Sequence, residues 1–243
     1  MQKPPLIAKV DLKLDCQCAM ATKGAKLMVS GHVSETKSQT PKITAAAINC
    51  NQSFEGLTEK IKDRYKGNFL REAKRASGFY CGPFTPGAFS SQIERINKSL
   101  PIRCGRPMRP AYLRSASELQ ASFGSGEYDG CRDHWSVWWG VSGPDGPNDL
   151  VGYIKLNRYG ELALYATILG HGDFLGRGIM PHLHLSVMRF IIDMDDGIKW
   201  LMYSGWYDGG KGLQLWKKKA GFDPVMFFSK QNQGGPQCHD TQF

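Results

Sequence analysis

The order of elements predicted over residues 134–192 constrains the fold of this chain more than any other sequence feature. Three strand-like runs are joined by short turns at residues 144–148 and 158–160, a pattern typical of an antiparallel meander. The runs are HWSVWWGVS, LVGYIKLNRY and ELALYATILG. The last run leads directly into the glycine-rich segment GHGDFLGRG. A helix is predicted from about 179 to 192, with Pro181 in its first turn, where a missing N–H costs little.

The flanking sequence predicts further strands and helices, so we expect an α/β protein. The additional strands are predicted at residues 6–14, 26–33, 43–50, 198–203 and 222–228. The additional helices are predicted at residues 56–77 with a candidate break at Gly67 and Asn68, at 88–99, in the second half of 103–124, and at 209–221, which Gly221 closes.

Chain length sets the expected domain organisation. At 243 residues, the chain can bury a sizeable core as one large domain, or as one main domain with a smaller attachment. We expect a β/α region over 1–102, a main domain over 103–229 and a flexible tail over 230–243, which is polar and glycine-rich. The first region is either part of the main fold or a degenerate half of it.

Composition indicates the kind of partner and the compartment. Lys and Arg total 31 against 22 Asp and Glu, a formal net charge of +9, which attracts tRNA, DNA or phosphate-bearing cofactors. A solvated basic surface without a nucleic-acid partner explains the same charge. The sequence has no run of 18 apolar residues and no secretory signal, so we expect a cytoplasmic protein with no membrane partner. The seven cysteines lack framework spacing, which favours reduced thiols. Nothing in the sequence indicates an oligomeric state.

The glycine-rich segment is the strongest candidate for a binding site. A glycine loop between a strand and a helix directs backbone N–H groups and the helix dipole at one point, which suits a phosphate. Gly176, Arg177 and Gly178 are the predicted contacts to that phosphate, because glycine lets a backbone approach closely. An ordinary tight turn also explains the glycines.

Two short motifs make residues 103–229 similar to the N-acetyltransferase (GNAT) superfamily. DFLGRGIM resembles the pyrophosphate loop of that family, and LWKKKAGFDPV resembles its ending of helix, Gly-Phe and strand. The resemblance implies a mixed, splayed central sheet flanked by helices, with an N-terminal β/α extension. It also implies an acyl donor, such as acetyl-CoA, between the two strands that part. Asp173 stands where the family has Gln or Arg, and Lys217, interpreted as a solvated helix lysine, stands where it often has a tyrosine.

A second similarity lies upstream of the main domain. RYKGNFLREAKRASGFYC, followed by INKSLPIRCGRPM, resembles the basic helix and linker of the Fem-type branch of the same fold. Enzymes of that branch take aminoacyl groups from aminoacyl-tRNA. The resemblance therefore implies an aminoacyl donor and a tRNA partner, although a basic surface helix explains the same residues.

Candidate catalytic residues flank the glycine loop. His171 and Asp173 are predicted to contact the acceptor amine or to act as its base. Glu161 is a second candidate base, or else a turn carboxylate facing Arg158. Tyr207 is a candidate acid. The N–H groups near Leu169 and Gly170 are predicted to hold the oxyanion of a tetrahedral intermediate.

We expect no metal site. His182 and His184 lie two residues apart on the predicted helix, so their side chains diverge. Cys16-x-Cys18 and Cys238-His239 each form half of a zinc-type clamp, but the sequence shows no companion at structural-site spacing.

These observations favour an N-acyltransferase that moves an acetyl or aminoacyl group from an activated donor to an amine acceptor. A nucleic-acid-modifying transferase of GNAT-like fold that acts on a base would account for the positive charge. A non-catalytic GNAT-fold binding module would account for Asp173 and Lys217.

Overall fold

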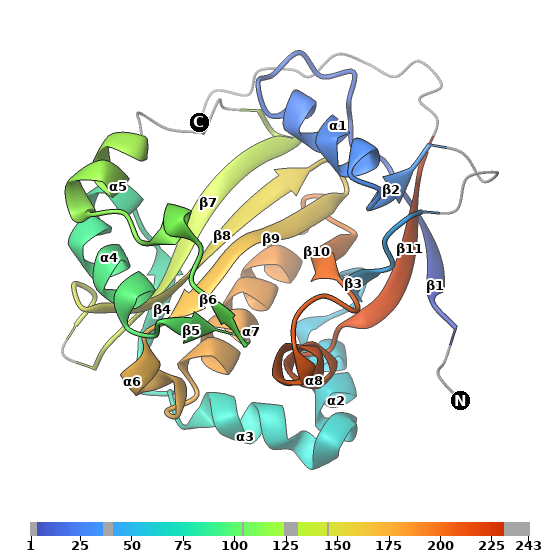
Figure 1. Cartoon of the computed structure of the whole chain (residues 1–243). Coiled ribbons are helices and arrows are strands. Elements are labelled where there is room, and N and C mark those ends of the chain that lie inside the picture. The colour runs from blue at the N-terminus through green and yellow to red at the C-terminus, as the bar shows by residue number, and fades with distance from the viewer. Residues whose placement is uncertain (1–3, 36–40, 104, 124–130, 145, 231–243) are drawn as a thin grey trace.

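A large mixed sheet forms the centre of the protein. The computed structural model describes residues 4–35, 41–103, 105–123, 131–144 and 146–230. The sheet has nine strands in the order β1-β11-β3-β10-β9-β8-β7-β4, and β2 pairs with β11 (Figure 1). Its strands are β1 (Leu6–Val10), β2 (Val33–Ser34), β3 (Ala45–Asn49), β4 (Tyr80–Pro83), β7 (His134–Ser142), β8 (Leu150–Tyr159), β9 (Leu162–Gly170), β10 (Trp200–Gly205) and β11 (Asp223–Ser229).

Helices flank this sheet, and a small hairpin of β5 (Ile102–Arg103) and β6 (Arg106–Pro107) lies apart from it. The helices are α1 (Ala21–Val29), α2 (Phe54–Asp63), α3 (Asn68–Lys74), α4 (Ser90–Lys98), α5 (Ala116–Ser122), α6 (Gly172–Leu175), α7 (Ile179–Asp193) and α8 (Lys211–Lys219), with short 3₁₀ turns at Arg64–Gly67, Pro86–Phe89 and Pro110–Tyr112. The predicted α/β class is confirmed.

The sheet has the predicted meander and the predicted splay. β7, β8 and β9 pair antiparallel along almost their whole length. β9 and β10 are parallel, and their register covers only Leu162–Leu164 with Trp200–Met202. Beyond those pairs, the carboxyl half of β9 has β8 on one side and diverges from β10 on the other (Figure 1).

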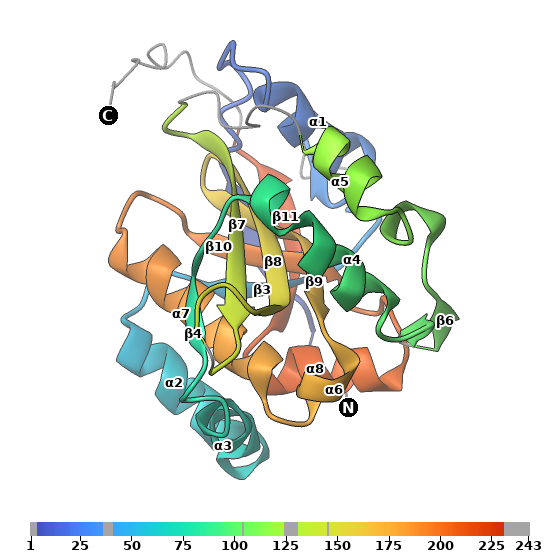
Figure 2. The same ribbon diagram turned by 90° about the vertical axis from the view of Figure 1, so that its left-hand side faces the viewer.

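Helices pack on both faces of the sheet. α7 buries its apolar side in a core that includes Trp135 and Leu183, whereas α4 and α5 contribute Ile96 and Leu119 to a separate core. Figure 2 shows the two groups on opposite sides of β7 and β8. Side chains alternate between the faces of a strand, so Trp138 packs against the α4–α5 core, on the face opposite that of Trp135.

The first 102 residues share the sheet with the rest of the chain. β3 lies between β10 and β11 and pairs antiparallel with both. β1 extends the β11 side of the sheet and β4 the β7 side. Strands from both predicted regions therefore belong to one sheet.

One predicted element is wrong. Residues 26–33 were expected to form a strand, but residues 21–29 form α1. The buried residues Met20 and Leu27 lie seven positions apart and join the core beside β11, so a 3.6-residue period fits this segment better than alternation. The strand predicted at 6–14 ends at Val10. The predicted flexible tail lies outside the described residues from 231 onward.

Candidate functional site

The parting of β9 from β10 leaves the carboxyl end of β9 without β10 as a hydrogen-bonding neighbour. The N–H of His171 donates to the Val151 carbonyl of β8 at 2.7 Å. Backbone groups alternate between the two edges of a strand, so the N–H of Gly170 points toward the β10 side, where the two strands have separated. The same alternation directs the N–H of Leu169 toward β8. Of the two N–H groups predicted to hold an oxyanion, that of buried Gly170 points to the parting and that of Leu169 points to β8, and the oxyanion role stays a prediction.

Cationic side chains reach the ends of both parting strands. Arg103 donates to the Gly170 carbonyl at 2.9 Å and to Ser99 Oγ at 3.0 Å. On the other strand, Lys217 Nζ donates to the Gly205 carbonyl at 2.6 Å and to the Asp208 carbonyl at 2.9 Å.

The interpretation of Lys217 as a solvated lysine is wrong. Its side chain is fully buried, and its ammonium group lies 5.5 Å from the centre of the Tyr203 ring. Burial of an ammonium group is costly unless hydrogen bonds compensate for lost water, and here two backbone carbonyls do so. Lys217 therefore stabilises the start of the loop that follows β10.

The glycine loop differs from the predicted phosphate cradle. One helical turn, α6, fills it, and the N–H groups of Arg177 and Gly178 donate to the carbonyls of Phe174 and Leu175 at 2.9 and 3.2 Å. A Cβ added at Gly178 would lie 1.8 Å from the Glu72 carbonyl oxygen of α3. The prediction that these two N–H groups face a phosphate is therefore wrong, because the loop itself uses them and α3 packs against it. Gly176 is exposed.

His171 and Asp173 lie together at the end of β9. His171 caps α6, because its Nδ1 accepts the Asp173 N–H at 3.4 Å. The Asp173 carboxylate lies 3.8 Å from the same nitrogen and is 86% exposed, against 14% for the His171 side chain. Because the cap uses the Nδ1 lone pair, a neutral His171 carries its proton on Nε2. This geometry favours contact with an acceptor over proton removal.

Glu161 lies far from these residues. It precedes β9, whereas His171 follows it, so about 30 Å of strand separates them at the usual rise per residue. Its carboxylate binds Lys199 and Lys230 and accepts the Asp11 N–H. The structure does not bring Glu161 to the site, so its assignment as a base is wrong. The alternative partner, Arg158, pairs instead with Asp133 and Asp196.

Tyr207 lies on the surface near the end of β10. Its side chain is 62% exposed, and it occupies the loop between β10 and α8. The role of Tyr207 as an acid stays a prediction.

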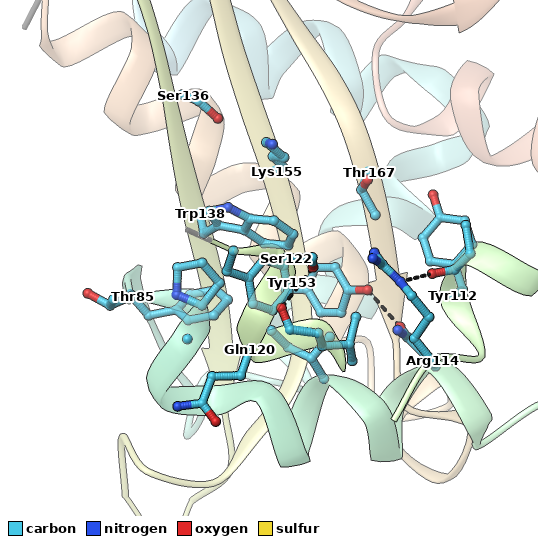
Figure 3. A pocket seen from close by; sticks show the side chains of 18 of the residues that line it. Thr85, Tyr112, Arg114, Gln120, Ser122, Ser136, Trp138, Tyr153, Lys155 and Thr167 are labelled. Atoms are coloured by element: carbon cyan, nitrogen blue, oxygen red, sulfur yellow. Dashed lines mark hydrogen bonds between the residues drawn. The ribbon is translucent and has the colours of Figure 1, made fainter. Parts of the chain in front are cut away.

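A pocket of about 900 Å³ lies between the meander and α4–α5 (Figure 3). Alternation places Ser136 and Trp138 of β7, Lys155 of β8 and Thr167 of β9 on the same face of the sheet. α5 covers part of the pocket and begins in a capping box, in which Ser115 and Glu118 satisfy each other's backbone N–H groups. Thr167 belongs to the half of β9 that has separated from β10, so the pocket adjoins the parting strands.

The charged residues of this pocket are all cationic. Arg109, Arg114 and Lys155 contribute to its lining, and none of the described lining residues is acidic. Lys155 Nζ lies 5.5 Å from the centre of the Trp138 ring, at cation–π distance. Such a lining favours an anionic ligand that has a flat ring or apolar part. We did not predict this pocket, although polar and aromatic residues at alternate positions of the meander strands were a usable signal.

Two buried residues near the parting strands have a structural role. The Tyr165 hydroxyl donates to His184 Nδ1 at 2.9 Å, and His184 Nε2 donates to the Ala220 carbonyl at 3.0 Å. Burial lowers the pKa of His184 to about 4, so the ring stays neutral at physiological pH. His182 instead approaches the Phe79 carbonyl, and the two helix histidines diverge as predicted.

The expectation of no metal site assumed that Cys16 and Cys18 have no companion ligands. The fold brings Cys131 and His134 to them, and the four ligand atoms lie within 4.8 Å of one another. Cys238 and His239 lie outside the described residues.

Two solved structures align with this chain. The crystal structure of FemX aligns with a TM-score of 0.50 and 12% identity over 83% of this chain and 65% of the FemX chain. A tandem GNAT protein from the clavulanic acid biosynthesis pathway, solved without AcCoA, aligns with a TM-score of 0.45 and 13% identity over 84% of this chain and 55% of its own. This chain thus spans less than two thirds of either structure. The protein has a mixed α/β fold similar to that of FemX.

Sequence comparisons add no relative: no family model and no curated protein matches the chain. Among the described residues, no helix has both the length and the apolar character needed to cross a membrane.

Proposed function

We propose that the protein is an N-acyltransferase whose acyl donor lies at the parting of β9 and β10. One observation carries this proposal: the sheet of a GNAT-like fold separates directly beside a pocket whose charged lining residues are all cationic. The strand separation gives a reacting carbonyl access to backbone N–H groups. The pocket offers a place for the anionic part of the same donor.

The reaction requires little from the protein beyond positioning and charge. An amine of the acceptor attacks the donor carbonyl, the carbonyl oxygen becomes negative, and the leaving group then departs with a proton. The Gly170 N–H is suited to stabilise that oxygen, because fixed dipoles directed at developing charge lower the barrier. Arg103 adds positive charge at the end of the same strand. His171 is suited to hold the acceptor.

Aminoacyl-tRNA fits the site better than acetyl-CoA does. A coenzyme A pyrophosphate would need loop N–H groups that Phe174 and Leu175 already occupy, and it would meet the exposed carboxylate of Asp173. A tRNA 3′ end instead carries separate phosphates and stackable bases. Lys155, Arg109 and Trp138 suit these groups, since cations bind the phosphates of single strands and aromatic rings stack on their bases.

The test measures donor binding and acyl transfer together. Fluorescence anisotropy with a labelled tRNA, repeated over a salt series, should give a slope of log affinity against log salt of about −0.7 per phosphate contacted. Lys155→Ala should reduce the magnitude of that slope by about 0.7, the value for one phosphate contact. The matched control is Lys62→Ala, since Lys62 is exposed and pairs with Glu59 on the same helix. Transfer from radiolabelled aminoacyl-tRNA to small primary amines reports the reaction itself.

The outcomes separate the candidate functions. Binding and turnover of acetyl-CoA, with no affinity for tRNA, would refute aminoacyl-tRNA as the donor. The proposed acyltransferase activity would stand. Binding without any transfer would support the non-catalytic module, which the occupied glycine loop also favours. Base modification of a tRNA or DNA without acyl transfer would support the nucleic-acid-modifying enzyme.

A further inference from the structure

A cluster of cysteine and histidine side chains lies at the end of the sheet opposite Gly170. The group consists of Cys16 and Cys18, in the segment between β1 and α1, and Cys131 and His134, at the start of β7. His134 pairs with Tyr159 at the end of β8, and Tyr159 pairs with Leu162 at the beginning of β9. The cluster is therefore about one strand length from Gly170 at the far end of β9.

The spacing of these atoms matches a tetrahedral metal site. Cys16 Sγ and Cys131 Sγ are 3.5 Å apart, and Cys131 Sγ is 3.6 Å from His134 Nδ1. Zinc–sulfur and zinc–nitrogen bonds of about 2.3 and 2.0 Å in a tetrahedron place two sulfurs about 3.8 Å apart and a sulfur and a nitrogen about 3.6 Å apart. All four atoms already lie within 4.8 Å, so coordination requires a contraction of about 1 Å or less.

His134 is oriented as a metal ligand. Its Nε2 donates to the Leu12 carbonyl at 2.8 Å, which leaves the Nδ1 lone pair directed at Cys131. Metal-bound histidines usually donate their other ring N–H to a carbonyl or carboxylate in this way, because that bond fixes the tautomer and the ring orientation. His134 and Cys131 are buried, and Cys16 and Cys18 are partly exposed.

We propose that Cys16, Cys18, Cys131 and His134 form a structural zinc site. Three thiolates and one imidazole complete a closed four-coordinate shell, which is typical of structural zinc and leaves no position for a substrate. A two-iron cluster fits less well, because its two irons would hold the ligand pairs farther apart than in this compact group.

The site joins segments that are distant in sequence. Cys16 and Cys131 are separated by 115 residues. The N-terminal segment otherwise contacts the turn between β8 and β9, where Asp11 and Glu161 exchange backbone and side-chain hydrogen bonds. Zinc would fasten this segment to β7, because metal binding stabilises the folded arrangement of its ligands.

Metal analysis of the full-length chain tests the proposal. Protein purified under reducing conditions without chelator, and then incubated with zinc and desalted, should hold about one zinc per chain by mass spectrometry of the metal. Cobalt(II) should give the intense visible absorption of a tetrahedral ion together with a thiolate-to-cobalt charge-transfer band. Cys16→Ser and His134→Ala should each lower zinc content at least about fivefold, and Cys81→Ser, which removes a thiol on β4 outside the cluster, should not.

Wild-type measurements keep the test decisive if a variant fails to fold. Chelation of zinc from the wild-type protein should make residues 11–20 more sensitive to limited proteolysis while the helix content measured by circular dichroism persists. Less than about 0.1 zinc per chain after incubation with zinc would overturn the proposal. A Cys16–Cys131 disulfide in protein purified under reducing conditions, detected as a loss of two hydrogens, would also overturn it, as would an octahedral cobalt spectrum.

Discussion

Replacement of Glu161 by Gln should lower stability and leave turnover intact. The Glu161 side chain is 14% exposed, and the two lysines that it binds are each 39% exposed. Exposed ion pairs contribute up to about 1 kcal/mol each after solvent screening. The hydrogen bond from the Asp11 N–H to a charged acceptor adds about 1 kcal/mol. Glutamine keeps the side-chain volume but removes the charge, so we expect the free energy of unfolding to fall by about 1–3 kcal/mol.

Urea unfolding at several pH values measures this effect. Burial alone would raise the pKa of Glu161, but hydrogen bonds from Lys199 and Lys230 outweigh it and hold the pKa below its ordinary value of 4.5. A carboxylate with a lowered folded-state pKa stabilises the protein above its unfolded-state pKa and loses that contribution as the pH falls through the folded-state pKa. The difference between wild type and variant should therefore be constant near pH 7 and shrink below about pH 4.5.

Glu59→Gln is the matched control. Glu59 is 67% exposed and pairs with Lys62 on the same helix, so we expect a change below about 0.5 kcal/mol. A Glu161→Gln protein as stable as wild type, but with strongly reduced turnover, would refute the structural role of Glu161 and restore its assignment as a base.

Other substitutions test the glycine loop, the buried histidine and the buried lysine. Gly178→Ala should cost more than about 1 kcal/mol in thermal unfolding, because φ is +81° and the new Cβ meets the Glu72 carbonyl, whereas Gly176→Ala has open space and should change stability by less than about 0.5 kcal/mol. Equal melting temperatures for the two variants would contradict the packing of α3 on this loop. His184 is neutral when folded, with a pKa of about 4 against an ordinary 6.5. The stability that depends on its neutral form is present above pH 6.5 and is lost as the pH falls toward 4, by up to about 3 kcal/mol. His184→Gln should lack this part of the pH dependence, and identical pH profiles would argue against a neutral buried ring. Lys217→Met should cost about 1–3 kcal/mol, because two carbonyls lose a buried donor, whereas the exposed Lys218→Met should cost little; equal costs would indicate that Lys217 is solvated.

The sequence predicted the central part of the fold well. The meander and α7 lie where periodicity and glycine positions indicated. The same is true of the C-terminal succession of α8, a Gly-Phe pair and β11. These features are local, because the alternation of a strand or the 3.6-residue period of a helix is visible within one segment. The error at residues 26–33 arose in a short segment, because Met20, which shows the helical period together with Leu27, lies outside the predicted range.

The candidate site was predicted less well, because its geometry depends on contacts between distant segments. The presence of Gly170 at the parting strands follows from strand order, but the choice between the N–H groups of Gly170 and Leu169 needed the register with β8. α3 packs against Gly178, and this contact joins residues more than 100 positions apart in the sequence. No local sequence pattern predicts such a contact. The alternation of Trp138 and Lys155 was visible in the sequence, but the pocket exists because α5 lies above them.

The sequence by itself determined the order of strands, glycine loop and helix, the positive charge and the likeness to a GNAT-like fold, because each follows from residues that are neighbours in the chain or from composition. The tertiary structure decided which polar groups have partners. It buried Lys217, engaged Glu161 in ion pairs, occupied the N–H groups of the glycine loop and gathered Cys16, Cys18, Cys131 and His134 at one point. The physical reason is that desolvation and hydrogen bonding depend on all the atoms around a group, and only the folded chain brings those atoms together.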